Sequence, residues 1–169
     1  VYLSAHCEFF LSNSTGLDGL PQIFRRPVAH ANIFMPLEVQ TAYPNKMFIP
    51  KKIRAQRTNT FLSFDEIYHL FPDITHAIDT LRDKQLEVIE NTPDEICDLV
   101  CAMERYAQKE YALTGEEEKL QQFFWQQFPL EAKESISGLP HYRNPPYTKI
   151  ESTFLLKNSD LLNLSKGHE

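Results

Sequence analysis

The first third of the chain has the alternation of apolar and small polar segments that is typical of an α/β unit. Residues 8–11 are an apolar run of strand length, residues 12–16 are small and polar, and residues 17–26 place apolar side chains at helical spacing before Pro27. Residues 28–33 form a second apolar run, which suits a strand buried in a parallel sheet. The pattern therefore predicts a strand, a tight loop, a helix and a second, parallel strand.

The middle of the chain predicts shorter extended elements. Residues 46–49 form a short extended segment between prolines, and residues 51–60 have the composition of a basic loop. Residues 86–90 alternate apolar and acidic side chains, as a half-exposed strand does.

The second half of the chain predicts helices. Ser63, Thr92 and Thr114 each stand three residues before a glutamate, which is the capping-box pattern at a helix start. We expect the helices that begin there to pack on the strands through their apolar faces. Residues 137–147 are rich in proline and predict a linker or surface loop, and residues 152–164 predict a final short helix.

These elements define the expected fold class. We predict an α/β domain with a Rossmann-like parallel sheet and flanking helices, followed by a mostly helical C-terminal part. Residues 1–92 would form the Rossmann-like part, and residues 93–169 the helical part that packs on it within the same domain. A length of 169 residues with 42% hydrophobic and 24% charged residues supports one ordinary globular domain and excludes a disordered chain.

The net charge of −6 is unevenly distributed along the chain. Residues 1–62 carry seven basic and three acidic side chains, a balance of +4, whereas residues 63–169 carry ten and twenty, a balance of −10. The cations are therefore concentrated in the part that contains the predicted tight loop. Because the whole chain is acidic and lacks a stacking or helix-turn-helix context, we expect no nucleic-acid partner.

The cysteines and the apolar segments exclude other classes. Cys97 and Cys101 stand four residues apart within an amphipathic run, so we expect two buried small hydrophobic side chains rather than a metal pair. The sequence pattern therefore predicts no metal site. The apolar stretches are far shorter than the ~20 residues that a membrane-spanning helix needs, so we expect no transmembrane segment. Because the sequence starts with Val1 instead of Met and enters residues 2–12 without a turn or cap, we expect it to be the later part of a longer polypeptide.

The strongest candidate for chemistry is the loop at Ser12, Asn13, Ser14, Thr15 and Gly16. A helix that begins just after a small polar loop offers unpaired backbone amides and the positive end of its dipole, which suit a phosphate or diphosphate. The competing interpretation is that a hydroxyl of this loop only caps the helix. The loop lacks the Gly-Lys-Ser/Thr of a Walker A motif and the second and third glycines of a dinucleotide fingerprint.

Several motifs together resemble a known family. They are Phe9–Gly16, Leu20–Val28, Asn32 followed by Met35-Pro36-Leu37, Phe48–Lys52, Leu62–Ile67 and, near the end, Phe154–Asn158. This set is similar to the C-terminal half of bacterial surface-carbohydrate glycosyltransferases, and the resemblance covers roughly residues 5 to 70. It implies two Rossmann-like domains, of which the C-terminal one holds a nucleoside-diphosphate sugar and an N-terminal one, in the same protein, holds the acceptor.

The resemblance also implies roles for particular residues. The small polar loop, often Asp-Ser-Gly in such proteins, approaches the donor diphosphate, and Asn13-Ser14-Thr15-Gly16 fills its place with Asn13 instead of the acid. No cofactor is implied, no catalytic residue can be assigned, and any catalytic base would belong to the acceptor domain. We expect the protein in the cytoplasm, with the periphery of the inner membrane as an alternative location.

Four further residues complete the predicted donor site. Lys51 and Lys52 could fold over the strand ends toward a diphosphate, Asn32 could bond a ribose or a sugar, and Glu38 is the one carboxylate expected nearby. His30 is expected to be a satisfied core histidine. The alternative function is a non-catalytic interaction domain in which the acidic helices over residues 93–134 bind a protein partner, and exposed aromatic side chains such as Phe124 and Trp125 would indicate it.

Overall fold

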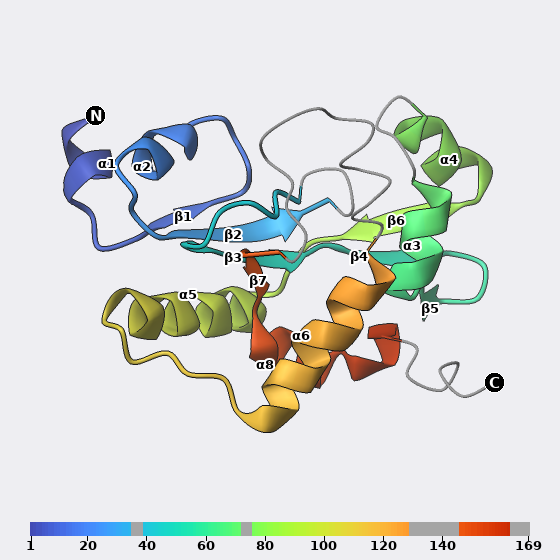
Figure 1. Ribbon diagram of the computed structural model, residues 1–169. Helices are drawn as coiled ribbons and strands as arrows, with labels where there is room; N and C mark the ends of the chain where they lie inside the picture. The colour runs from blue at the N-terminus through green and yellow to red at the C-terminus, as the bar shows by residue number, and fades with distance from the viewer. Residues whose placement is uncertain (35–38, 72–75, 129–145, 163–169) are drawn as a thin grey trace.

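A four-stranded parallel sheet is the framework of the chain in this computed structural model (Figure 1). Its strands lie in the order β1 (Phe10–Ser12), β2 (Val28–Ile33), β3 (Lys46–Pro50) and β7 (Lys149–Ile150). Each neighbouring pair is parallel. The structure describes residues 1–34, 39–71, 76–128 and 146–162.

A small antiparallel sheet continues from the parallel one. Its strands lie in the order β5 (Thr60–Phe61), β4 (Lys52–Ala55) and β6 (Leu86–Ile89). Only Lys51 separates β3 from β4, so one nearly continuous extended run serves both sheets.

Helices cover both sides of the parallel sheet (Figure 1). The short helices α1 (Tyr2–His6) and α2 (Gly19–Ile23) lie on one side, and α5 (Pro93–Ala107) lies on the other and contacts β2 and β3. The remaining helices are α3 (Phe64–Leu70), α4 (Ala77–Asp83), α6 (Gly115–Gln127), α8 (Ser152–Lys157) and the 3-10 helix η1 (Ser159–Leu162). The expected mixed α/β fold with a parallel sheet, flanking helices and a helical C-terminal part is confirmed.

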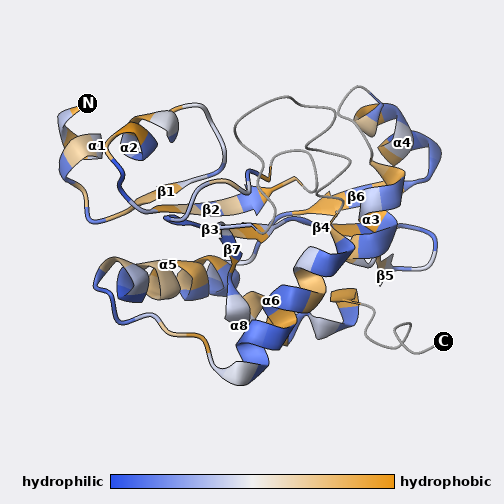
Figure 2. Ribbon diagram, viewed as in Figure 1, coloured by the Kyte–Doolittle hydropathy of each residue, from blue (hydrophilic) through white to orange (hydrophobic). Residues whose placement is uncertain are grey.

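The core forms where α3 and α6 pack against the strands. Phe64 and Phe124 meet edge to face with ring centroids 5.1 Å apart, and both are fully buried. Phe124 also lies 6.0 Å from the ring of Phe48 in β3. Figure 2 shows apolar segments in the central strands and polar segments on the outer turns of the helices. The capping boxes at Ser63, Thr92 and Thr114 are confirmed, which explains why these helices begin where the sequence predicts.

The prediction of a basic loop over residues 51–60 is wrong, since β4 covers Lys52–Ala55 and β5 begins at Thr60. The reason is that cross-strand partners satisfy its charged side chains. Arg54 pairs in register with Glu87 of β6, and Arg54 Nη2 lies 2.7 Å from Glu87 Oε2. Such an opposite-charge pair stabilises an antiparallel ladder, but the partner lies 33 residues further along the chain.

Other boundaries also differ from the sequence pattern. The helix predicted over residues 17–26 is reduced to the five residues of α2, while α1 and α4 were not anticipated. Strand β7 lies just after the predicted linker, most of which is outside the described residues. Its Ile150 exchanges two hydrogen bonds with the side-chain amide of Gln121 from α6. A side chain from a distant helix thus completes the pairing of this strand.

An exchange of hydrogen bonds between two asparagines ties the parallel sheet to the antiparallel one. The Asn32 amide donates to Asn91 Oδ1, and the Asn91 amide donates to Asn32 Oδ1, each at 2.6 Å. Asn91 Nδ2 also donates to the Pro50 carbonyl at 2.8 Å, at the end of β3. Asn32 has φ 58°, a left-handed conformation that asparagine tolerates better than most residues. The ends of β2, β3 and β6 therefore meet at one junction.

Replacing Asn91 by alanine tests this junction. We expect Asn91→Ala to lower the free energy of unfolding by about 2–4 kcal/mol, because a buried backbone amide and a carbonyl each lose their partner. Chemical denaturation of the variant and of the wild type measures the difference. Asn13→Ala, at an exposed asparagine near the same sheet edge, is the control and should change stability by less than about 0.5 kcal/mol. An Asn91→Ala variant as stable as this control would contradict the role of the junction.

Candidate functional site

The carboxyl edge of the parallel sheet brings together three of the predicted site segments. Ser12 ends β1 beside His30 of β2, and the loop at Ser12–Gly16 follows. Asn32 lies at the end of β2, and the Lys51 amide donates to the Ile33 carbonyl at 2.9 Å. Ligands of open parallel sheets bind outside the carboxyl ends of the strands. Glu38 lies outside the described residues.

The loop after β1 has an unusual backbone. Ser14 has φ 65° and Gly16 has φ 42°, so two of its residues are in the left-handed region. Alternation of right- and left-handed residues can turn successive amide N–H groups toward one anion. Asn13, Thr15 and Gly16 are exposed, and Ser12 and Ser14 are half-buried. The loop is open to a ligand.

The helix after this loop contributes less to anion binding than the sequence suggested. Helix α2 starts at Gly19 instead of Leu17, and Asp18 at its N-cap makes no side-chain cap bond. The Asp18 carboxylate is turned to His30 instead, with Asp18 Oδ2 2.7 Å from His30 Nε2. Any anion at the loop would therefore depend on loop amides and side chains more than on a helix dipole.

Asp18 belongs to a buried polar cluster with His30 of β2 and Lys46 of β3. Asp18, His30 and Lys46 are at most 6% exposed, and Lys46 Nζ donates to Gln40 Oε1 at 2.7 Å. Burial and the nearby Lys46 charge lower the pKa of His30 to about 4, against the opposing effect of Asp18. Burial likewise lowers the pKa of Lys46 to about 8. His30 is thus a buried and neutral histidine at pH 7, with its Nε2 in close contact with the Asp18 carboxylate.

Lys51 and Lys52 take different roles. Lys51 Nζ lies 2.9 Å from Glu90 Oε1, and the glutamate side chain is 62% exposed. This open pair leaves the lysine available to a stronger anion. Lys52 Nζ lies 2.7 Å from Glu95 Oε1, in a pair whose side chains are 12% and 9% exposed. Lys52 is therefore committed to the start of α5, and of the two only Lys51 is a candidate for ligand binding.

The side chain of Asn32 is also committed. Its Oδ1 accepts from the Asn91 amide, so the carboxamide oxygen that could have met a ribose serves the junction. The sequence pattern alone could not show this, because Asn91 is 59 residues away. The binding role of Asn32 stays a prediction, and it is restricted to the side-chain nitrogen Nδ2.

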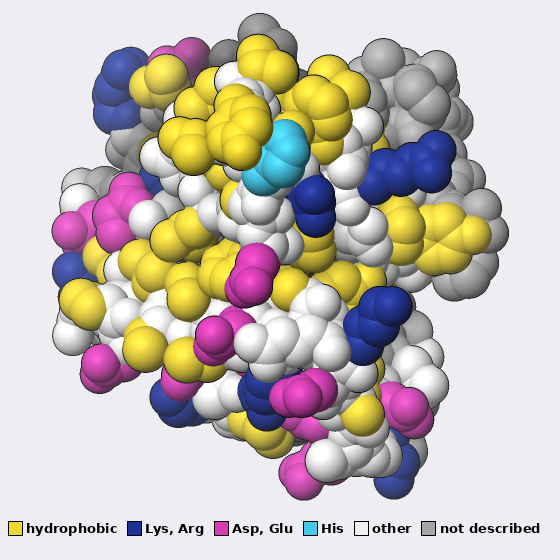
Figure 3. Space-filling model, turned by 90° about the vertical axis from the view of Figure 1, so that its left-hand side faces the viewer, with side chains coloured by type: hydrophobic (Ala, Val, Ile, Leu, Met, Phe, Trp, Pro, Cys, Tyr) yellow, Lys and Arg dark blue, Asp and Glu magenta, His cyan; other side chains and the backbone are white. Residues whose placement is uncertain are grey.

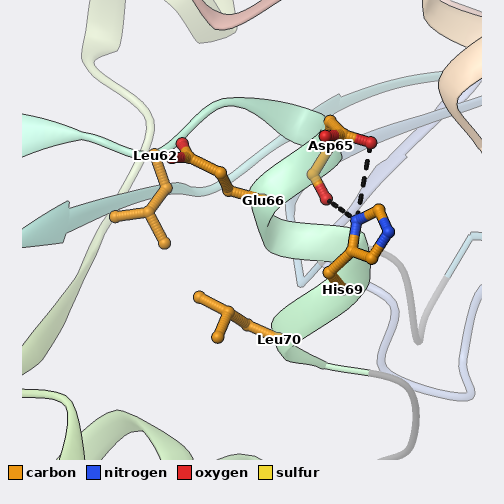
Figure 4. Close-up of a pocket in the computed structure, with 5 residues that line it drawn as sticks. All are labelled: Leu62, Asp65, Glu66, His69 and Leu70. Atoms are coloured by element: carbon orange, nitrogen blue, oxygen red, sulfur yellow. Dashed lines mark hydrogen bonds and ion pairs between the residues drawn. The ribbon is translucent and has the colours of Figure 1, made fainter.

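Another hollow lies on α3, away from the predicted residues. Leu62, Asp65, Glu66, His69 and Leu70 line a volume of about 530 Å³ (Figure 4). His69 Nδ1 bonds the Asp65 carbonyl at 2.8 Å, and the Glu66 carboxylate accepts from the Ser63 amide in the capping box. Two carboxylates without a lysine or arginine in the lining would repel a diphosphate.

A third hollow, of about 240 Å³, lies at the amino edge of the sheet. It is lined by Arg25, Arg26 and Lys46 together with Gln22, Val28, Tyr43, Pro44 and Asn45. Arg26 Nε donates to the Ala5 carbonyl at 2.7 Å. Because Arg25 and Arg26 precede the start of β2, this arginine pair lies at the amino end of the strands, opposite to the Ser12–Gly16 loop.

The prediction for Cys97 and Cys101 is wrong, since both thiols are exposed on α5. The buried stripe of this helix is formed by other residues, among them Leu99, Ala102 and Met103. Within the described residues, no group of three or more potential metal-ligating side chains comes together. In the same part of the chain, no helix has the length and apolar character needed to cross a bilayer.

The buried Lys52–Glu95 pair gives the first prediction for this site. Burial disfavours the Glu95 carboxylate, but hydrogen bonds from Lys52, the Thr92 amide and Asn158 outweigh it and lower the pKa. We expect Glu95→Gln to lower the free energy of unfolding at pH 7 by about 3 kcal/mol, because the charge of Lys52 remains without its partner. Urea denaturation measures this loss.

Glu117→Gln is the matched control for Glu95→Gln. Glu117 has the same capping-box position at the start of α6 but forms no ion pair with another described residue, so its replacement should cost about 1 kcal/mol or less. The stability that the Glu95 carboxylate contributes is present above its unfolded pKa and is lost as the pH falls through the lower folded pKa. Equal losses in the two variants would show that the ion pair contributes nothing beyond the cap.

The pKa of His30 predicts a second pH dependence. Its folded pKa of about 4 lies below the ordinary 6.5, so the unfolded chain binds the proton first and stability falls as the pH drops below 6.5. Between pH 7 and pH 5 this group should cost about 2 kcal/mol. Denaturation curves at both pH values should show a smaller loss in His30→Gln, whereas His69→Gln should keep the full slope. An unchanged slope in His30→Gln would refute the assignment.

Comparisons of the chain with protein-family models, with curated proteins and with solved structures gave no match. The fold is therefore described from its own strand order and register. For function, the geometry of the carboxyl edge and the motifs of the sequence carry the argument.

Proposed function

We propose that this chain is the donor-binding part of a glycosyltransferase-like protein and holds a nucleoside-diphosphate sugar at the carboxyl edge of its parallel sheet. The observation that carries the proposal is the meeting of the Ser12–Gly16 loop, the end of β2 and Lys51 at this one edge. A polar loop with left-handed residues and a nearby half-exposed cation suit a diphosphate. The sequence motifs that resemble glycosyltransferases come from the same segments.

In this proposal the diphosphate is bound by the loop and approached by Lys51. Glu90 holds Lys51 in the absence of a ligand, and a diphosphate with more than one negative charge competes for the same ammonium group. Lys52 supports the site indirectly, because its pair with Glu95 fixes the start of β4 against α5. The chain contributes donor binding, and the transfer to an acceptor requires a second domain.

An exposed apolar surface supports a partner domain. Large apolar side chains gather on α1, α2, β1 and the loop between them, at Val1, Tyr2, Leu3, Leu11, Leu17, Ile23 and Phe24. Figure 3 shows hydrophobic side chains on the side of the molecule that carries these helices. Contiguous apolar surface of this kind is typical of an interaction site. We propose that the acceptor-binding domain of the same protein, in the cytoplasm, packs here.

The helical alternative for partner binding has less support. Phe124 is fully buried, and Trp125 packs against the core with its ring centroid 5.3 Å from that of Phe128. The aromatic patch on α6 that a protein-interaction domain would expose is therefore absent at these two side chains. On α6 the exposed aromatic side chain is Phe123, whereas the α1–α2 side exposes the larger group of apolar side chains.

Nucleotide titration tests the donor site. Millimolar UDP or GDP should shift the NMR amide signals of Ser12–Leu17 and Lys51. Lys51→Ala should weaken binding about 5- to 10-fold through loss of one charge-assisted bond, whereas Glu90→Gln should strengthen it because the competing carboxylate charge is removed. Arg57→Ala, at an exposed arginine in the β4–β5 turn, is the matched control and should leave the dissociation constant unchanged. No shift in the loop at millimolar nucleotide would refute the proposal.

A further inference from the structure

Cys97 and Cys101 form a pair of exposed thiols on the outward face of α5. Residues four apart on a helix are neighbours on one face, so the two exposed thiols lie next to one another on α5. The pair lies on the face opposite to Leu99, Ala102 and Met103, which are fully buried. Packing therefore does not explain the two cysteines, because neither side chain fills a space in the core.

Carboxylates surround the thiol pair. Asp94 and Glu104 are exposed on the same helix, three residues before Cys97 and three residues after Cys101. Asp98 lies between the two cysteines, and its carboxylate bonds Lys157 Nζ at 2.5 Å. The neighbouring Cys97, followed by burial, Glu104 and Asp98, raises the pKa of Cys101. This environment opposes a free thiolate and thus a role as nucleophile, but it favours a cation that takes the place of the thiol protons.

We propose that Cys97 and Cys101 form a two-coordinate site for a soft, thiophilic cation of the Cu(I) type. Thiolates are the ligands that Cu(I) prefers, and a sulfur–metal–sulfur arrangement needs only two ligands. This agrees with the lack of any cluster of three or more potential ligands among the described residues. In the binding step one Cu(I) forms two copper–sulfur bonds, and both thiol protons pass to solvent. No electron is transferred.

The site is independent of the proposed donor site. It consists of side chains on the outward face of α5, whereas the loop at Ser12–Gly16 and Lys51 lie at the carboxyl edge of the sheet. Failure of nucleotide binding would leave the thiol pair untouched, and failure of cation binding would leave the donor site untouched.

Competition with bicinchoninate under anaerobic, reducing conditions tests the proposal. The wild-type chain should remove one equivalent of Cu(I) from the coloured bicinchoninate complex, and Cys97→Ser and Cys101→Ser should each abolish this. Cys7→Ser is the matched control, since it removes the third thiol, whose Sγ bonds the Ser4 carbonyl, and should leave the competition unchanged. Because all these changes are conservative and the two tested positions are exposed, circular dichroism should show the same fold in every variant.

Two further measurements distinguish this site from other kinds of metal binding. Because two protons leave for each Cu(I), the affinity should rise about 100-fold per pH unit while both thiols are protonated, whereas binding by carboxylates would be flat between pH 6 and 8. Size-exclusion chromatography should show the protein as a monomer both with and without Cu(I), so that copper induces no dimer. A flat pH profile, binding that survives in both serine variants, or one Cu(I) shared between two chains would overturn the proposal.

Discussion

The exchange of hydrogen bonds between Asn32 and Asn91 is the constraint on which the arrangement of the two sheets depends. The pairing of β2 with β3 shifts register between His30 and Ile33, so the parallel ladder is irregular at Asn32, just before the chain enters the antiparallel sheet after β3. Asn91, which follows β6, supplies the missing partner for Asn32 and bonds the Pro50 carbonyl. The left-handed conformation of Asn32 turns its backbone toward that partner. Three strand ends are thereby fixed relative to one another.

The same junction distributes the charges of the candidate site. Lys51 and Lys52 follow one another in an extended segment, where successive side chains point in opposite directions. One therefore enters the buried pair with Glu95 at the start of α5, and the other meets the exposed Glu90. The cationic character of the first third of the chain is thus partly structural, and a single lysine remains to approach an anion beside the loop after β1.

The sequence predicted the parts of the fold that local chemistry controls. The capping boxes at Ser63, Thr92 and Thr114 set the starts of three helices, and the apolar run at 28–33 matched β2. It did not predict features that need a distant partner. Examples are the Arg54–Glu87 pair that makes β4 a strand, and the Asp18–His30 contact, which turns the side chain of the α2 N-cap residue away from its helix. The exposure of Cys97 was missed because a short apolar side chain in an amphipathic run carries little directional information.

Native-state hydrogen exchange of the amides of Asn32, Lys51 and Asn91 tests the junction most directly. These amides belong to three segments and donate across the junction to Asn91, Ile33 and Asn32, respectively. If the two sheets form one cooperative unit, all three amides should exchange only through global unfolding, with the same free energy of opening as the amides of β2 and β3. Rapid local exchange of Asn91 while β2 and β3 stay protected would contradict the account, because the antiparallel sheet would then open independently.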